Sequence, residues 1–306
     1  MSAAPISAGI DLGGTKIEAQ VFADDWSLSA RHRWPTPKDY PALVTAMTTA
    51  IRWCEVQGAR LPVGISAAGL INPRTGLALT SNLPATGKPF PADIAKAAGR
   101  PVAWINDCRA LTLSEASLGA ARGADPAVGL ILGTGVAGGV VTGGKLLPSP
   151  AATGGEFGHF PLAAAPITAH GLPILPCGCG RLGCAETYLS APGLARIATH
   201  LTSQTHSPET IVSNRAENPQ FAQAWDIWLD LATDFLVTLL LTIDPQVIVL
   251  GGGLSRAPGL TDDLTQRLTQ ATLKSFPIPA IRLAEGGDAS GARGAALHAL
   301  NEAAHA

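Results

Sequence analysis

ISAGIDLGGTKIEAQVF, the stretch of residues 6–22, decides the fold. An apolar run ends in Asp11, the turn residues Gly13-Gly14-Thr15-Lys16 follow, and alternating apolar residues then continue to Phe22. Two such runs around glycines predict a β-hairpin. Residues 28–34 predict a third strand, which would complete an antiparallel meander.

Segments with helical spacing and short apolar runs alternate along the rest of the chain. The first half continues as helix 41–57, strand 62–66, helix 91–98, strand 102–105 and a helix after Asp107. The pattern restarts with strands 128–132 and 138–141, which indicates an internal duplication. A long helix 220–243, a buried strand 247–250 and a final helix 292–303 follow. At about 150 residues per domain, the 306 residues predict two α/β domains.

The composition excludes several classes of protein. Lys and Arg number 21 against 23 Asp and Glu, a net charge of −2, so we expect no nucleic-acid partner. Hydrophobic residues make up 46% of the chain, which argues against disorder. Residues 127–144 are uncharged but rich in glycine and not helix-periodic, so no membrane span is expected. The opening MSAAPISAG has neither a basic segment nor a long apolar one, so we expect no secretory signal and a cytoplasmic protein.

Three glycine turns follow predicted strands, at Gly13-Gly14-Thr15-Lys16, Gly133-Thr134-Gly135 and Gly251-Gly252-Gly253. Glycine lets backbone N–H groups approach phosphate oxygens, Thr adds a donor and Lys adds a positive charge. Asp11, just before the first turn, is a candidate Mg²⁺ ligand through water. Each turn alone also suits a structural tight turn, but three in two similar halves favour a nucleotide held between two domains.

Asp107 follows Asn106 where a predicted strand passes into a helix. Phosphoryl transfer from ATP needs a carboxylate that orients the acceptor hydroxyl and takes its proton. Asp107 suits that role, and the alternative is that Asp107 is only the N-cap of the helix.

A histidine and three cysteines predict a metal site: His159, Cys177, Cys179 and Cys184. Three thiolates and an imidazole satisfy tetrahedral Zn²⁺, and four protein ligands indicate structural zinc. Free cysteines beside an unrelated histidine are the alternative. The zinc would also fix two nearby carboxylates, Glu156 and Glu186, which are good acceptors for sugar hydroxyls.

These motifs resemble the ROK family (repressors, open reading frames and sugar kinases) over essentially the whole chain. DxGGTK appears at residues 11–16, ND at 106–107, LGTGxGGG at 132–139, GExGH at 155–159, CGCGxxGCxE at 177–186 and GGG at 251–253. The resemblance implies an actin-like (ribonuclease H-like) ATPase fold, in which two α/β domains flank a cleft and one carries a zinc-bound loop. We expect a smaller domain of residues 1–118 and 288–306, and a larger one of residues 119–287.

The resemblance also implies ATP-dependent phosphorylation of a hexose, with Asp107 as general base. Positions matching the family's sugar-binding residues are Asn106, Asp107, Glu156, His159 and Glu186. ATP, with Mg²⁺, would lie against Gly13, Gly14, Thr15, Lys16, Gly133, Thr134, Gly135, Gly252 and Gly253. A homodimer is the family's usual assembly.

Residues 81–89, SNLPATGKP, resemble the sugar-side loop of bacterial N-acetylglucosamine kinases, with Asn82 as a substrate residue. We therefore expect the 6-hydroxyl of N-acetyl-D-glucosamine to be phosphorylated. Residues 31–40 are similar to fructokinases and residues 140–147 to N-acetylmannosamine kinases, so those sugars and glucose are alternatives.

Four residues depart from the family's usual pattern: Ala68, Cys108, Arg109 and Ala137. Arg109 either lowers the pKa of Asp107 or points to solvent. A sugar-sensing repressor of this family would carry a helix-turn-helix domain before the first glycine turn, and because eight residues precede Gly9 we do not expect one here. A sugar sensor without chemistry is the remaining alternative, against which Asp107 and Lys16 argue.

Overall fold

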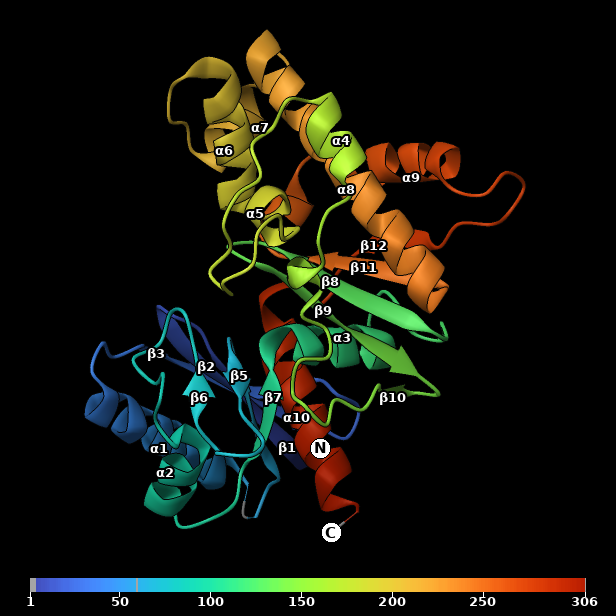
Figure 1. Ribbon diagram of the computed structural model, residues 1–306. Coiled ribbons are helices and arrows are strands. Elements are labelled where there is room, and N and C mark those ends of the chain that lie inside the picture. Colours follow the sequence, from blue (N-terminus) through green and yellow to red (C-terminus); the bar gives the residue numbers. More distant parts are fainter. Residues whose placement is uncertain (1–3, 59, 306) are drawn as a thin grey trace. The chain divides into compact units, whose positions relative to one another are not determined.

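The computed structural model describes residues 4–58 and 60–305, which divide between two α/β units (Figure 1). The first unit comprises residues 1–119, 145–154 and 285–306, and the second comprises residues 120–144 and 155–284. The sequence analysis assigned residues 145–154 to the second domain, whereas the structure groups them with the first unit, although residues 145–146 also form the edge strand of the second sheet. Residues 1–3 of the opening stretch, in which no secretory signal is expected, lie outside the described residues.

A five-stranded mixed sheet forms the centre of the first unit, in the order β3-β2-β1-β4-β7. Its strands are β1 (Pro5–Leu12), β2 (Lys16–Ala23), β3 (Leu28–Pro35), β4 (Val63–Ala67) and β7 (Ala103–Asn106). The first three strands are the expected antiparallel meander, and β4 and β7 continue the sheet in parallel with β1. The carboxyl ends of β1, β4 and β7 therefore meet at one edge.

Four helices accompany this sheet: α1 (Tyr40–Gln57), α2 (Phe90–Ala98), α3 (Asp107–Leu118) and α10 (Ser290–Ala303). A side chain at Gly9 of β1 would lie 1.8 Å from the carbonyl oxygen of Ala292, so glycine lets α10 pack directly on the sheet. A short hairpin of β5 (Leu70–Ile71) and β6 (Ala78–Leu79) completes the unit. The sequence analysis did not foresee this hairpin, because two-residue strands carry no readable period.

The second sheet repeats the arrangement of the first, in the order β10-β9-β8-β11-β12. Its strands are β8 (Ala127–Leu132), β9 (Val136–Thr142), β10 (Lys145–Leu146), β11 (Val247–Gly251) and β12 (Ala280–Leu283). In both sheets an antiparallel hairpin is extended on its first strand by two parallel strands, as an internal duplication requires.

The helices of the second unit are α4 (Ala164–Ala169), α5 (Glu186–Leu189), α6 (Ala191–Thr202), α7 (Pro208–Asn214), α8 (Pro219–Ile243) and α9 (Leu260–Ala271). Short 3₁₀ turns occur at Phe157–His159, Leu254–Arg256 and, in the first unit, Gly287–Ala289. The apolar core of the second unit contains Trp225, Trp228 and Phe235 of α8, each at most 5% exposed. Within residues 4–58 and 60–305, every helix is too short or too polar to cross a membrane.

Candidate active site and metal centre

Asp11 lies at the carboxyl end of β1, opposite Ser66 of the parallel strand β4. The Ser66 hydroxyl donates to Asp11 Oδ1 at 3.1 Å. Burial, followed by the negative charge of Asp107, raises the pKa of Asp11 to about 7. The strand edge therefore carries two carboxylates close enough to interact.

Asn106 ends β7 and is the N-cap of α3, so the hypothesis that Asp107 serves only as that cap is wrong. Asn106 Oδ1 accepts from the backbone N–H groups of Cys108 (3.0 Å) and Arg109 (3.3 Å), while its Nδ2 donates to Gly69 O (3.2 Å). Asp107 Oδ1 also accepts from Cys108 N at 2.9 Å. Burial nevertheless raises the pKa of Asp107. A carboxyl with a raised pKa suits a group that must take a proton near neutral pH.

The sequence analysis considered that Arg109 either lowers the pKa of Asp107 or points to solvent, and the structure shows neither. Its guanidinium donates to Leu147 O at 2.9 Å and to Gly154 O at 3.3 Å, within the first unit. The pKa of Asp107 is set by burial and nearby hydrogen bonds instead. Arg109 therefore ties the segment 145–154 to the start of α3.

The first glycine turn joins β1 to β2. Gly13 N donates to Lys16 O at 2.9 Å, and a side chain at Gly14 would lie 3.0 Å from the Cβ of Asn82. Thr15 is exposed at the tip, and Lys16 Nζ lies 3.5 Å from Glu18. The structure thus brings one sugar-side candidate, Asn82, next to a turn predicted to bind ATP.

The second and third glycine turns lie side by side in the second unit, at the ends of the parallel strands β8 and β11. A side chain at Gly133 would be 3.9 Å from the Cα of Gly252. Gly252 has φ +86°, and a side chain there would be 2.5 Å from Leu132 O, so this position requires glycine. Thr134, Gly252 and Gly253 are exposed, which leaves their polar groups open to a ligand. Ala137 of β9 pairs with Ile131 of β8 and therefore lies outside the turn itself.

Contacts with β9 place Glu186, and the chain next to Glu156, near the second glycine turn. Glu186 Oε2 accepts from Val136 N at 3.2 Å and would be 2.8 Å from a side chain at Gly135. Gly138 N of β9 donates to Gly155 O at 2.7 Å, which fixes the chain next to Glu156. Glu156 Oε2 is 3.8 Å from His159 Nε2.

The predicted zinc ligands form a cluster in which all four ligand atoms lie within 4.8 Å of one another: His159, Cys177, Cys179 and Cys184. With Zn–S at about 2.3 Å and Zn–N at about 2.0–2.1 Å, a tetrahedral site has S···S edges of about 3.8 Å and S···N edges of about 3.6 Å. Cys179 Sγ and Cys184 Sγ are 3.7 Å apart, and Cys177 Sγ is 3.6 Å from His159 Nδ1. The donor set and its spacing therefore fit Zn²⁺ with His159 bound through Nδ1.

Backbone hydrogen bonds join the two ends of this cluster. Ala185 N donates to Phe160 O at 2.8 Å, and Cys177 N donates to Arg181 O at 2.8 Å. Glu186 follows directly in α5, so the metal loop and the carboxylate at the second glycine turn form one rigid piece of chain.

Comparisons with known proteins agree with this geometry. Residues 7–302 match the sequence pattern described as the ROK family. The chain belongs to the ROK family. It is 38% identical to an N-acetylgalactosamine kinase, AgaK, of Shewanella sp. (strain ANA-3) over 94% of this chain and 95% of that protein. It is 37% identical to an N-acetyl-D-glucosamine kinase of Yersinia pseudotuberculosis over 96% of this chain and 99% of that protein.

Two solved ROK structures share the fold. A ROK hexokinase from Thermus thermophilus superposes with a TM-score of 0.87 at 32% identity, covering 98% of this chain and 99% of that chain. A ROK glucokinase from Streptomyces griseus, in complex with glucose and AMPPNP, superposes with a TM-score of 0.77 at 26% identity, covering 95% and 98%. The two mixed five-stranded sheets are those of the ROK actin-like fold.

Proposed function

We propose that this ROK-family sugar kinase, an ATP-dependent phosphotransferase, phosphorylates the 6-hydroxyl of an N-acetylhexosamine and prefers N-acetyl-D-glucosamine as the sugar. The single observation that carries the proposal is the placement of Asp107 directly after the strand β7, in the same sheet as Asp11 and the first glycine turn. The names of the relatives support the class of sugar.

Asp107 is the general base in this account. It takes the proton of the 6-hydroxyl as the sugar oxygen forms its bond to the γ-phosphorus, and the bond from the γ-phosphorus to the bridging oxygen of ADP breaks. Burial raises the pKa of Asp107, which makes its carboxylate a stronger proton acceptor. Asn106, fixed by its capping bonds, orients the sugar beside it.

The glycine turns supply backbone N–H donors for the phosphates of ATP. The adjacent turns at Gly133 and Gly252 hold part of the nucleotide in the second unit, and Lys16 adds a positive charge in the first. Asp11 would hold, through water, the Mg²⁺ that accompanies ATP. The ion would neutralise charge on the phosphates.

Zn²⁺ held by the cysteine cluster would have a structural role, since all four ligands would come from the protein. It would fix Glu186 and, through His159, the neighbouring Glu156. We infer that His159 Nε2, the ring nitrogen that would remain free of zinc, contacts the sugar together with these two carboxylates.

N-acetyl-D-galactosamine is the second candidate sugar. It differs from N-acetyl-D-glucosamine only at C4, and the relative AgaK is named as an N-acetylgalactosamine kinase.

We infer that the enzyme is cytoplasmic, where ATP and Mg²⁺ are supplied. We also infer a homodimer, to be tested by size-exclusion chromatography with light scattering.

The test is a coupled ADP-release assay with MgATP and a panel of sugars, with Asp107→Asn as the blank. The panel contains N-acetylglucosamine, N-acetylgalactosamine, N-acetylmannosamine, glucose and fructose. The proposal predicts the highest kcat/KM for N-acetylglucosamine. A preference for glucose or fructose would overturn the choice of sugar, and sugar binding without ADP release would favour a sensor without chemistry.

A further inference from the structure

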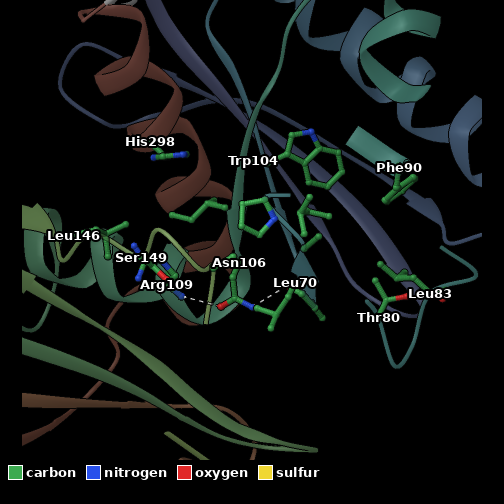
Figure 2. A pocket seen from close by; sticks show the side chains of 17 residues that line it. Leu70, Thr80, Leu83, Phe90, Trp104, Asn106, Arg109, Leu146, Ser149 and His298 are labelled. Carbon is green, nitrogen blue, oxygen red and sulfur yellow. Dashed lines mark hydrogen bonds between the residues drawn. The ribbon is translucent and has the colours of Figure 1, made fainter. Parts of the chain in front are cut away.

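A cavity of about 360 Å³ opens beside Asn106, lined entirely by residues of the first unit (Figure 2). Its walls are mainly apolar and come from the β5–β6 region, α2, β7 and the segment 145–154: Leu70, Ile71, Leu83, Phe90, Trp104 and Leu146. Its volume falls within the usual range of small-molecule sites. Asn106, proposed to bind the sugar, lines the cavity, but none of the residues assigned above to ATP, zinc or catalysis is among its lining residues.

The basic side chains that line the cavity, Arg109 and His298, are already engaged. Arg109 donates to Leu147 O and Gly154 O, and His298 Nε2 lies 3.2 Å from Glu302 Oε1. Burial also lowers the pKa of His298, so these two groups attract an anionic ligand only weakly. A sugar hydroxyl against the apolar walls would lose its hydrogen bonds to water without replacement. A neutral apolar group is therefore the ligand that suits this cavity.

The sugar of the proposed reaction carries such a group, because the 2-acylamino substituent ends in an alkyl chain. An acetyl group has three heavy atoms, a small ligand for a cavity of about 360 Å³. Most of the cavity would then remain empty. A pentanoyl group has six heavy atoms, twice as many, and would use more of it.

We propose that this cavity binds the acyl chain of a 2-acylamino sugar, and that the kinase accepts chains longer than acetyl. The inference rests on the proposed function and extends its substrates to 2-acylamino sugars with longer acyl chains. Each methylene that enters the apolar cavity is expected to raise kcat/KM about fourfold until the chain reaches solvent.

The experiment compares N-acetyl-, N-propanoyl-, N-butanoyl- and N-pentanoylglucosamine with glucose, using the whole protein and MgATP. We expect kcat/KM to rise from acetyl to butanoyl. A value for N-butanoylglucosamine ten or more times below that for N-acetylglucosamine would overturn the proposal while leaving the kinase intact. ADP release with none of the sugars would overturn the proposed function, and this inference with it.

Two variants localise the effect. Leu70→Trp fills the cavity and is expected to abolish the gain from acetyl to butanoyl. Leu79 pairs with Leu70 across the hairpin but is 63% exposed, so Leu79→Trp adds the same bulk outside the cavity and should keep the gain. An unchanged gain in a folded Leu70→Trp protein would overturn the location. If Leu70→Trp does not fold, Ile71→Phe, another wall residue, serves as the filling variant.

Discussion

Replacing Glu115 by Gln is expected to destabilise the first unit strongly, because this buried carboxylate accepts hydrogen bonds from four donors among the described residues. Oε1 accepts from Gly286 N (2.9 Å), Ser290 Oγ (2.8 Å) and Arg293 Nη2 (3.1 Å), and Oε2 accepts from Glu285 N (3.0 Å). Glu115 is fully buried, and the side chain of Arg293 is 16% exposed. The network joins α3, which begins at Asp107, to the segment that leads into α10.

The size of the effect follows from these contacts. An amide has one acceptor oxygen, so its NH₂ group would face at least one N–H or O–H donor, and a lost bond to a charged acceptor costs about 1.5–3 kcal/mol. Arg293 also loses its counter-charge, and breaking a buried pair costs about 3–5 kcal/mol. The two losses overlap, so we expect about 3–5 kcal/mol in the free energy of unfolding. For a unit of about 150 residues this lowers Tm by about 6–20 °C.

The assay is urea unfolding followed by tryptophan fluorescence, with Glu55→Gln as the matched control. Glu55 Oε1 pairs with Arg100 Nη1 at a similar distance, 3.2 Å, but the side chain of Glu55 is 37% exposed. Exposed pairs contribute about 0–1 kcal/mol, so the control should unfold almost as the wild type does. Equal, small losses in both variants would refute the reasoning.

Four further predictions concern activity and metal content. Asp107→Asn should lower kcat by about 10²–10⁴ with sugar binding retained in calorimetry, and a kcat near that of the wild type would remove Asp107 as the base. Cys179→Ser should lose zinc by elemental analysis and melt at a lower temperature, and a metal-free wild-type protein with full activity would contradict this role. Asp11 must be deprotonated to hold Mg²⁺, and burial together with the charge of Asp107 raises its pKa to about 7, so kcat/KM should fall as the pH drops through about 7. The raised pKa of the base Asp107 acts in the same direction, and a profile flat to pH 5 would exclude this. Arg109→Lys keeps the charge but cannot span both Leu147 O and Gly154 O, so the KM for sugar should rise about tenfold while the KM for ATP stays unchanged. Equal changes in both KM values would contradict this by indicating a general loosening of the fold.

Local features of the structure were predictable from the sequence. The hairpin of residues 6–22 and the strand before Asn106 have clear apolar patterns, and their packing reproduces the expected sheet. The cluster of His159 with three cysteines was also predictable, because three cysteines within eight residues of a short loop favour a shared metal site.

Long-range features were not predictable. Glu115 contacts residues about 170 positions away, and Arg109 contacts Gly154 at a separation of 45. Neither pair leaves a trace in local periodicity, which reports only on neighbours along one helix or strand. The cavity beside Asn106 was missed for the same reason, since its walls come from several separate elements. The assignment of residues 145–154 to the first unit likewise depends on contacts such as those of Arg109.

Identification of the product by phosphorus–proton correlation NMR tests the central claim most directly. The protein is incubated with MgATP and N-acetyl-D-glucosamine, and the products are examined without purification. The account predicts ADP and a new phosphorus signal that correlates with the two protons on C6 of the sugar. Inorganic phosphate as the only new phosphorus species besides ADP, or a phosphorus correlated with another ring position, would contradict transfer to the 6-hydroxyl.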